Sequence, residues 1–333
     1  MSQRVRDLAD GLAMIVTDLH GDWDAYARYR DRFLSLHERG AVDRWILCGD
    51  LIHSEGPAHS DRSLEMILEV MGLQEAYGPD AVIMLTGNHE FPHLYGFTLS
   101  RGAIDYTPRF EWALVQAGPE VRSRVMAFID GLPFYARTAA GVMIAHCGAA
   151  PLAAMPENRE RLLAFSHQAL IRQLDELLAT FDLGELRDNY ERLFGRDYDQ
   201  AVRDYLAVTG PTDPRYRDLL RSLLLNGDSG FLLLWDTFFT LNERGMPDEV
   251  YANVLTRFLE TWSVGAPAPQ RVLVSGHIPV QGGHRIVAER QLRLASWAHA
   301  HPHESGVYLR LDCASPVQTP DELVPHLGSV YAA

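Results

Sequence analysis

The chain has 333 residues, of which 47% are hydrophobic and 22% charged, an ordinary composition for a soluble globular protein with one large or two medium domains. Its 30 basic and 44 acidic residues give a formal net charge of −14, which argues against a nucleic-acid-binding surface or an anionic membrane partner. No apolar run approaches the roughly 18 residues of a membrane-spanning helix, and the first residues lack the apolar core of a signal peptide. We therefore expect a cytoplasmic protein with no membrane partner.

Five short apolar runs, each ending abruptly in residues that commonly bind metals, follow one another along the chain. Such runs, bounded by glycine, are typical of buried strands. The runs and the polar residues after them are 12–16 with Asp18 and His20, 44–48 with Asp50, 81–85 with Asn88 and His89, 141–145 with His146, and 271–274 with His277. Ligands gather beyond the carboxyl ends of strands in open α/β sheets. We therefore expect these side chains to meet at one sheet edge and to hold two metal ions.

Helices are predicted between these strands. Asp22 is the expected N-cap of a helix that runs to about Glu38, with an apolar face of aromatic residues. The other predicted helices cover about 62–76, two short pieces within 110–130, and about 247–262. Further strands are expected at 132–135, antiparallel to 141–145, and at 285–289, 291–295 and 307–311.

Between residues 156 and 225 the pattern changes to helical periodicity, rich in Leu, Arg and Asp. We interpret this stretch as a helical insertion or cap within a single catalytic domain formed by 1–155 and 226–333. Its leucine stripes are expected to pack internally rather than to form a partner surface. It could overhang the metals and restrict the substrate.

Individual residues also have less specific explanations. A lone aspartate such as Asp18 can simply cap a helix, but Asp18 and His20, two residues apart in an extended loop, can chelate one cation. Asp50 has two oxygens and could bridge two cations at the roughly 3.5–4 Å spacing of binuclear sites. His53 could be a ligand, a partner of one, or a solvated loop residue. His299, His301 and His303 alternate in a loop and could bind a stray transition metal, but we expect them to be solvated.

The ordered motifs DLHGD, GDLIH, GNHE, HCG and GHIP resemble those of the calcineurin-like metallophosphoesterases, and specifically of their PPP protein-phosphatase branch. The segments 94–97, 132–133, 233–235 and 242–245 also look like landmarks of that branch, in the same order. The resemblance covers most of the chain except 156–225. It implies an α/β fold, a four-layer α/β/β/α sandwich of two mixed sheets.

The resemblance also implies a binuclear-metal-dependent phosphoester hydrolase, most simply a phosphomonoesterase or protein phosphatase that uses a water between the metals. The implied ligands are Asp18, His20 and Asp50 for the first metal, and Asp50, Asn88, His146 and His277 for the second. His89 would be the general acid and Arg244 the phosphate-clamping arginine. Mixed imidazole, carboxylate and amide ligands suit manganese, with iron or zinc as alternatives.

The second motif departs from the family pattern. Where relatives usually carry an Asp that orients the catalytic histidine and an Arg that clamps phosphate, this chain has His53 and Ser54. His53 would then face His89 and could alter the pKa of that acid. Arg101, or an arginine of the helical insertion, could replace the missing guanidinium.

Three functions are compatible with these observations. The first is hydrolysis of a phosphorylated protein or small phosphomonoester. The second is hydrolysis of dinucleoside polyphosphates such as diadenosine tetraphosphate, an activity of bacterial enzymes that resemble the same branch. The third is a regulatory binding module that kept the fold and lost the chemistry, which the full set of implied ligands makes less plausible.

Overall fold

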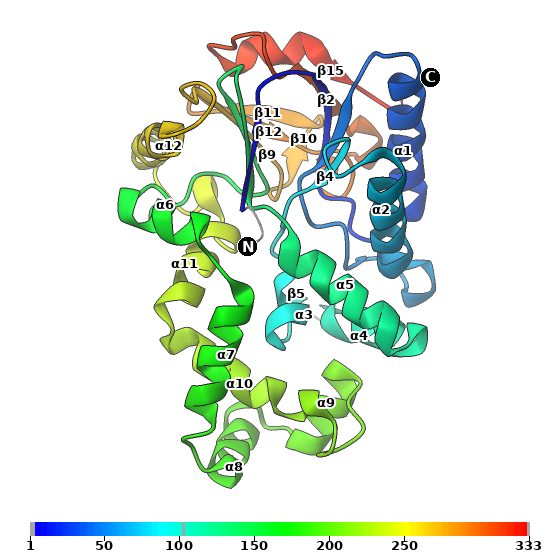
Figure 1. Cartoon of the computed structure of the whole chain (residues 1–333), viewed down its shortest axis with the longest axis vertical. Coiled ribbons are helices and arrows are strands. Elements are labelled where there is room, and N and C mark those ends of the chain that lie inside the picture. Colours follow the sequence, from blue (N-terminus) through cyan, green and yellow to red (C-terminus); the bar gives the residue numbers. More distant parts are fainter. Residues whose placement is uncertain (1–3, 102–103, 332–333) are drawn as a thin grey trace.

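The computed structural model describes residues 4–101 and 104–331, and its centre is a pair of β-sheets (Figure 1). The first sheet has the strand order β15-β14-β2-β3-β4. Its strands are β2 (Leu12–Val16), β3 (Arg44–Leu47), β4 (Val82–Met84), β14 (Tyr308–Asp312) and β15 (Leu327–Gly328). β2, β3 and β4 run parallel, while β14 is antiparallel to β2. The carboxyl ends of three consecutive strands therefore lie together.

The second sheet has the order β1-β7-β8-β9-β12-β11. Its strands are β1 (Val5–Leu8), β7 (Tyr135–Thr138), β8 (Val142–Ala145), β9 (Val272–Ser275), β11 (His284–Val287) and β12 (Gln291–Leu294). β8 and β9 are parallel neighbours, so the two remaining ligand-bearing strand ends also lie side by side. β7 and β8 pair antiparallel as predicted, but β7 begins at Tyr135, the last residue of the strand predicted at 132–135, and β1 was not predicted. Two short pairs, β5 (Ser100–Arg101) with β6 (Ile104–Asp105) and β10 (Val280–Gln281) with β13 (Ala300–His301), lie outside these sheets.

Both sheets are mixed and pack face to face. The inner residues of their strands form one buried cluster, to which Ala13, Ile46, Ile144, Val274 and Leu309 belong. The alternate residues of the same strands face helices in a larger cluster. Because a strand turns successive side chains to opposite faces, runs that are apolar at every position are needed for strands covered on both sides. The predicted four-layer α/β/β/α sandwich is confirmed.

Helices cover the outer faces and the site end of the sheets. Those of the first half of the chain are α1 (Trp23–Glu38), α2 (Ser63–Tyr77), α3 (Phe91–Tyr95), α4 (Thr107–Ala117) and α5 (Pro119–Gly131). α11 (Ser229–Phe238) and α12 (Asp248–Ser263) follow in the second half. Figure 1 places α1 and α2 on the side of β2 to β4 and α12 on the opposite side. The Asp22 side chain accepts a hydrogen bond from the Ala25 amide, so the predicted N-cap of α1 is confirmed.

Residues 156–225 are helical apart from their connections, as the periodicity predicts. They form α6 (Pro156–Leu163), α7 (His167–Leu178), α8 (Leu183–Phe194), α9 (Tyr198–Leu206) and α10 (Asp218–Leu224). α8, α9 and α10 share a small hydrophobic core of their own, and α8 and α9 lie at the end of the molecule farthest from the sheets (Figure 1). None of the helices described at 4–101 and 104–331 combines the length and apolar composition that a membrane crossing needs.

Candidate metal centre

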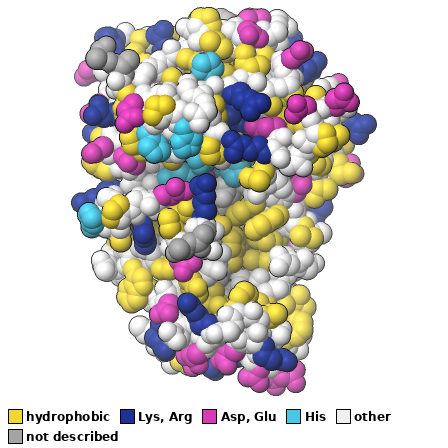
Figure 2. Space-filling view, turned by 180° about the vertical axis from the view of Figure 1, so that it is seen from behind, with side chains coloured by type: hydrophobic (Ala, Val, Ile, Leu, Met, Phe, Trp, Pro, Cys, Tyr) yellow, Lys and Arg dark blue, Asp and Glu magenta, His cyan; other side chains and the backbone are white. Residues whose placement is uncertain are grey.

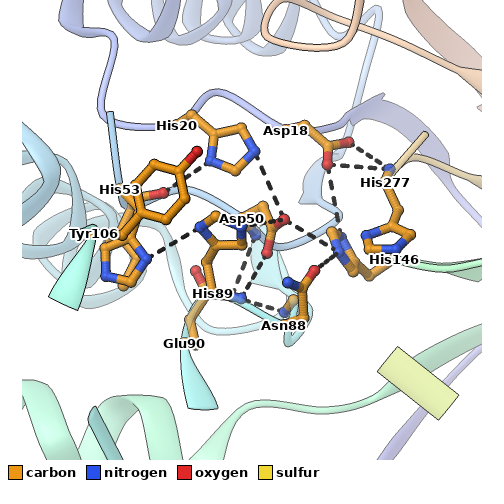
Figure 3. A network of polar contacts seen from close by, with 12 residues as sticks. Asp18, His20, Asp50, His53, Asn88, His89, Glu90, Tyr106, His146 and His277 are labelled. Carbon is orange, nitrogen blue, oxygen red and sulfur yellow. Dashed lines mark hydrogen bonds and ion pairs between the residues drawn. The ribbon is translucent and has the colours of Figure 1, made fainter. Parts of the chain in front are cut away.

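The predicted ligands meet in space, although they come from strand ends of both sheets rather than from one edge. Asp18 and His20 follow β2, Asp50 follows β3, and Asn88 follows β4. His146 follows β8 and His277 follows β9. Figure 3 shows all six side chains converging on one volume. Five of these side chains are buried behind the strand ends and His277 is partly buried, so charges interact strongly here.

The backbone at these residues is unusual. Asp18, His20, Asp50 and His277 have φ of 27°, 43°, 50° and 75°, in the left-handed region, and so does His53 at 73°. Non-glycine residues seldom adopt this conformation, and it costs free energy that the surrounding structure must supply. A cluster of strained residues at converging loop ends is typical of a functional site.

Backbone carbonyls fix the orientation of two histidines. The Nδ1 atom of His20 lies 3.1 Å from the carbonyl oxygen of Ile52, and that of His146 lies 2.8 Å from the carbonyl oxygen of Cys48. Since a carbonyl only accepts, each Nδ1 carries the proton. Each Nε2 is then directed toward Asp50, at 3.7 Å from Oδ2 for His20 and 3.3 Å for His146. A carbonyl-bound imidazole of this kind is the usual support of a metal ligand.

Asp50 lies between two groups of candidate ligand atoms. One group joins it to His20 and His89, the other to Asp18 and His146, and within each group the atoms lie within 4.8 Å of one another. Burial alone would raise the pKa of Asp50, but the imidazoles of His146 and His89 lower it well below its usual value. Asp50 is therefore a carboxylate that belongs to both groups and could bind a cation.

Two buried imidazole nitrogen atoms at the site have no hydrogen-bond partner, and they indicate whether the side chains around them suit metal ions. His277 donates its Nε2 proton to the carbonyl of Thr240 at 3.1 Å, and its buried Nδ1 makes no hydrogen bond. The Nδ1 of His299 is also buried and unpaired, 3.2 Å from Asp18 Oδ1. An unpaired buried lone pair is costly, and a divalent cation between these nitrogens and the carboxylates would remove that cost. The donor set therefore fits transition-metal ions.

His299 corrects one expectation. It is not solvated but 8% exposed, and with Asp18 and His20 it forms a third group of candidate ligand atoms within 4.8 Å. The residue follows β12 in a segment without periodicity, so only its histidine identity hinted at a role.

Cys147 lies in a group with His146 and His277. Its thiol donates to the Phe238 carbonyl, and burial raises its pKa, so it stays a protonated thiol.

Glu90 holds the loop after β3, which carries Asp50, against the loop after β4, which carries Asn88. It is fully buried, and its carboxyl group accepts hydrogen bonds from the backbone amides of Gly87, Asp50 and Leu51 at 2.8–3.2 Å. A Cβ atom at Gly87 would collide with the Asp50 backbone and side chain. Burial, followed by the charge of Asp50, raises the pKa of Glu90 to about 7. Sequence reasoning placed Glu90 in a motif but gave it no role.

His89 and His53 face each other, as the altered second motif implied. Their Nδ1 atoms are 3.1 Å apart, while His89 Nε2 lies 3.9 Å from Asp50 Oδ2, on the metal side (Figure 3). The His89 amide also donates to Asp50 Oδ1 at 3.0 Å. Burial lowers the pKa of His89 to about 3. A phosphate dianion held beside it would raise that pKa again.

Arg244 lies at the rim beside His277. Its Nη2 donates to the carbonyl of Pro279 at 2.6 Å, and its side chain is exposed. Arg293, which the sequence did not single out, is fully buried and bonds both the Gly276 carbonyl and the Glu243 carboxylate. Arg293 thereby holds the loop of Arg244 against the loop of His277.

Of the candidate replacements for the missing second-motif arginine, Arg101 and, within the insertion, Arg215 pair with other carboxylates. Arg101 pairs with Glu55 at 2.7 Å on the surface. Arg215, of the helical insertion, pairs with Glu111 at 2.6 Å. Ser54 does line an open cleft of about 650 Å³ that begins at His20. No residue of 156–225 lines this cleft within the described parts of the chain, so the insertion does not cover it. Histidines gather on this side of the molecule, with arginines and a hydrophobic area around them (Figure 2).

Comparisons with known proteins give one family match. Residues 13–138 match the family model of the calcineurin-like phosphoesterases. No curated protein matches the chain. Among solved structures, a protein serine/threonine phosphatase from Saccharomyces cerevisiae has 12% identity over 93% of this chain and 77% of its own, with a TM-score of 0.49. A cold-active protein tyrosine phosphatase has 12% identity over 95% and 80%, with a TM-score of 0.46. A metallophosphoesterase from Sphaerobacter thermophilus has 20% identity over 42% and 47%, with a TM-score of 0.25.

The matched segment contains the ends of β2, β3 and β4, and with them Asp18, His20, Asp50, Asn88 and His89. They are among the residues that the structure brings together, whereas His146 and His277 lie outside the matched segment. The chain therefore carries a segment, residues 13–138, that is similar to the calcineurin-like phosphoesterases, and this similarity supports a metal-dependent phosphatase.

Proposed function

We propose that the protein is a phosphomonoesterase acting on phosphorylated protein or on small phosphomonoesters at a centre of two transition-metal ions, most simply manganese. The observation that carries this proposal is the position of Asp50 between two groups of buried ligand atoms. Asp18, His20, Asp50 and the added ligand His299 would hold one ion. Asp50, Asn88, His146 and His277 would hold the other. Residues 156–225 would form a separate helical insertion in the catalytic domain.

When bound, the two ions would neutralise phosphoryl charge and supply an activated water. The chain's own residues do the rest. Asp50 and Glu90 fix the loops that present the ligands, and Arg244 would contact a phosphoryl oxygen from the rim, where an arginine can bind bidentately. His89, with Nε2 on the metal side, would give its proton to the leaving oxygen as the bond between that oxygen and phosphorus breaks.

The cleft favours a phosphomonoester over a dinucleoside polyphosphate. A chain of four phosphates needs several cations along its groove. Among the residues that line the cleft, Arg62 is the one arginine, against the acidic Asp22, Asp24 and Glu55. This lining suits a peptide or a small group next to one phosphate better than a polyphosphate.

The test is phosphate release by manganese-loaded protein from phosphoserine, phosphothreonine and phosphotyrosine peptides, compared with diadenosine tetraphosphate. We expect turnover of a peptide, abolished by Asp50→Asn. Preferential turnover of the nucleotide would replace the proposal with a polyphosphate hydrolase. Metal binding without turnover of any substrate would favour the regulatory module.

A further inference from the structure

A chain of buried side chains leads from His89 away from the metal centre. His89 Nδ1 contacts His53 Nδ1 at 3.1 Å, and His53 Nε2 contacts His93 Nε2 at 2.7 Å. His93 Nδ1 contacts Glu111 Oε1 at 2.7 Å. The three residues beyond His89 are each 5% exposed or less. The proposed function assigns a role to none of these three residues.

The far end of this chain has a defined charge. Glu111 Oε2 accepts from Arg122 Nη1 and from Arg215 Nη2, each at 2.6 Å. Burial alone would raise the pKa of Glu111, but the hydrogen bond from His93 and the two guanidinium groups lower it to about 2. Glu111 is therefore ionised and can only accept hydrogen bonds.

An acceptor at one end fixes the direction of every bond that follows. Because Glu111 accepts, His93 carries its proton on Nδ1, and its Nε2 is left as an acceptor. His53 must then donate from Nε2, which leaves its Nδ1 as an acceptor. His89 accordingly donates from Nδ1 whether its ring is neutral or cationic. Its Nε2 is the nitrogen that faces the metal side.

Packing keeps the chain of imidazoles in place and away from water. The Tyr106 ring stacks on the His53 ring with centroids 5.6 Å apart and an angle of 8° between the planes. Phe110 packs against His93, with centroids 4.6 Å apart. In such a dry environment an unpaired imidazole nitrogen would be costly, so the bond directions are strongly enforced.

We propose that Glu111, His93 and His53 form a positioning relay that takes the place of a carboxylate next to His89, holding its ring with Nδ1 donating and Nε2 toward the substrate. The inference rests on the proposed function in assigning His89 the role of proton donor. During the reaction His89 releases the Nε2 proton to the leaving oxygen and becomes neutral, while its Nδ1 proton stays on the bond to His53. No proton has to travel along the relay.

The relay also connects the helical insertion to the site. Arg215 belongs to 156–225, while Arg122 belongs to α5. Glu111 and His93 lie on α4 and α3. The insertion therefore supports His89 through a hydrogen-bonded path rather than by covering the metals.

His53→Asp offers a direct rescue. The atom of His53 that accepts from His89 is Nδ1, which is bonded to Cγ as an aspartate oxygen is, so an aspartate at 53 can accept the same proton without His93 or Glu111. The left-handed φ of 73° at this residue is one that aspartate tolerates. In the His53→Asp protein, His89 no longer needs the relay.

The kinetic experiment compares two substrates with the manganese-loaded full chain. A phosphoserine peptide has a leaving oxygen that needs a proton, whereas p-nitrophenyl phosphate has a good leaving group that does not. We expect His93→Phe to lower kcat for the peptide by roughly 10²-fold, within the range of general-acid catalysis, and to change kcat for p-nitrophenyl phosphate by less than about threefold. His37→Phe, a half-buried imidazole packed beside Phe33 on α1, is the matched control and should change neither.

The double variant His53→Asp with His93→Phe should match His53→Asp alone on both substrates. Equal losses on the two substrates from His93→Phe, or a further loss in the His53→Asp background, would overturn the relay. Glu111→Gln, which keeps the shape of the side chain, should reproduce the substrate-selective loss if His93→Phe folds poorly.

A spectroscopic measurement separates this inference from the proposed function. Nitrogen NMR of the metal-free protein labelled at histidine should show His89 protonated at Nδ1 in the native chain and a mixture of tautomers in His93→Phe. An unchanged His89 tautomer in His93→Phe would refute the relay even if the enzyme is active. Absence of activity on every substrate, with the tautomer change present, would count against the proposed function alone.

Discussion

The bridging position of Asp50 leads to a sharp prediction for Asp50→Asn. The asparagine keeps an oxygen for the His89 amide, which lies 3.0 Å from Asp50 Oδ1, but it replaces the carboxylate oxygen between the two ligand groups with a donor. In the metal-free protein the substitution removes the favourable interaction of the Asp50 carboxylate with the His146 and His89 imidazoles, so each variant is compared with itself, with and without manganese. With metal present, both sites should lose affinity.

The size of the effect follows from linkage. A ligand at 100 times its Kd stabilises the folded state by about 2.7 kcal/mol per site. With roughly 2.1 cal/mol/K of unfolding entropy per residue, a chain of this length has about 0.7 kcal/mol/K. Two occupied sites should therefore raise the melting temperature by about 8 °C in the native protein. A 100-fold loss of affinity at both sites would reduce the increase to less than about 2 °C.

The assay is thermal unfolding with and without manganese, together with phosphate release. Asp43→Asn is the matched control, because Asp43 lies at the opposite end of β3 and bonds the Leu12 amide at 2.7 Å; it should keep the full metal-induced increase. Asp50→Asn should also lose at least about 10³-fold in kcat, since the metals contribute several kcal/mol to the transition state. Retention of the full metal-induced shift in Asp50→Asn would refute Asp50 as a bridging ligand.

Three other predictions concern single residues. His299→Ala should lower the metal content measured by elemental analysis from two ions per chain toward one. His303→Ala, on the exposed part of the same segment, should leave it at two. An unchanged metal content in His299→Ala would exclude His299 as a ligand. Arg244→Ala should lower kcat/KM for the peptide by roughly 30–100-fold, the size of a charge-assisted hydrogen bond, with the metal content unchanged; a loss of metal would instead mean that Arg244 supports the ligand loops. The pKa of Glu111 is lowered to about 2, so its ionised form adds about 3 kcal/mol to the free energy of unfolding above its usual pKa near 4.5, and this is lost as the pH falls toward 2. Glu111→Gln should therefore be less stable than the native chain at pH 7. It should also lose less stability than the native chain between about pH 4.5 and about pH 2.

The sequence determined the main strands and the metal-ligand candidates because their signals are local, while the four-layer arrangement was implied by the family resemblance. A run of consecutive apolar residues predicts a strand covered on both faces, and a polar residue immediately after such a run predicts a side chain at a strand end. Asp18, His20, Asp50 and Asn88 all follow strands of one parallel set. Their meeting could therefore be predicted without coordinates. The cap at Asp22 and the helices of 156–225 were likewise predictable from short-range patterns.

Tertiary structure decided the parts of the site that depend on distant segments. His299 meets Asp18 across most of the length of the chain, and His93 and Glu111 become partners because α3 and α4 pack together. Nothing in the local sequence distinguishes these residues from a surface histidine or a helix glutamate. Which nitrogen of each imidazole carries the proton is also set by its partners in space, a carbonyl for His20 and an ionised carboxylate for His93. Local patterns fix secondary structure, whereas hydrogen-bond direction in a buried site is fixed only when the chain brings donors and acceptors together.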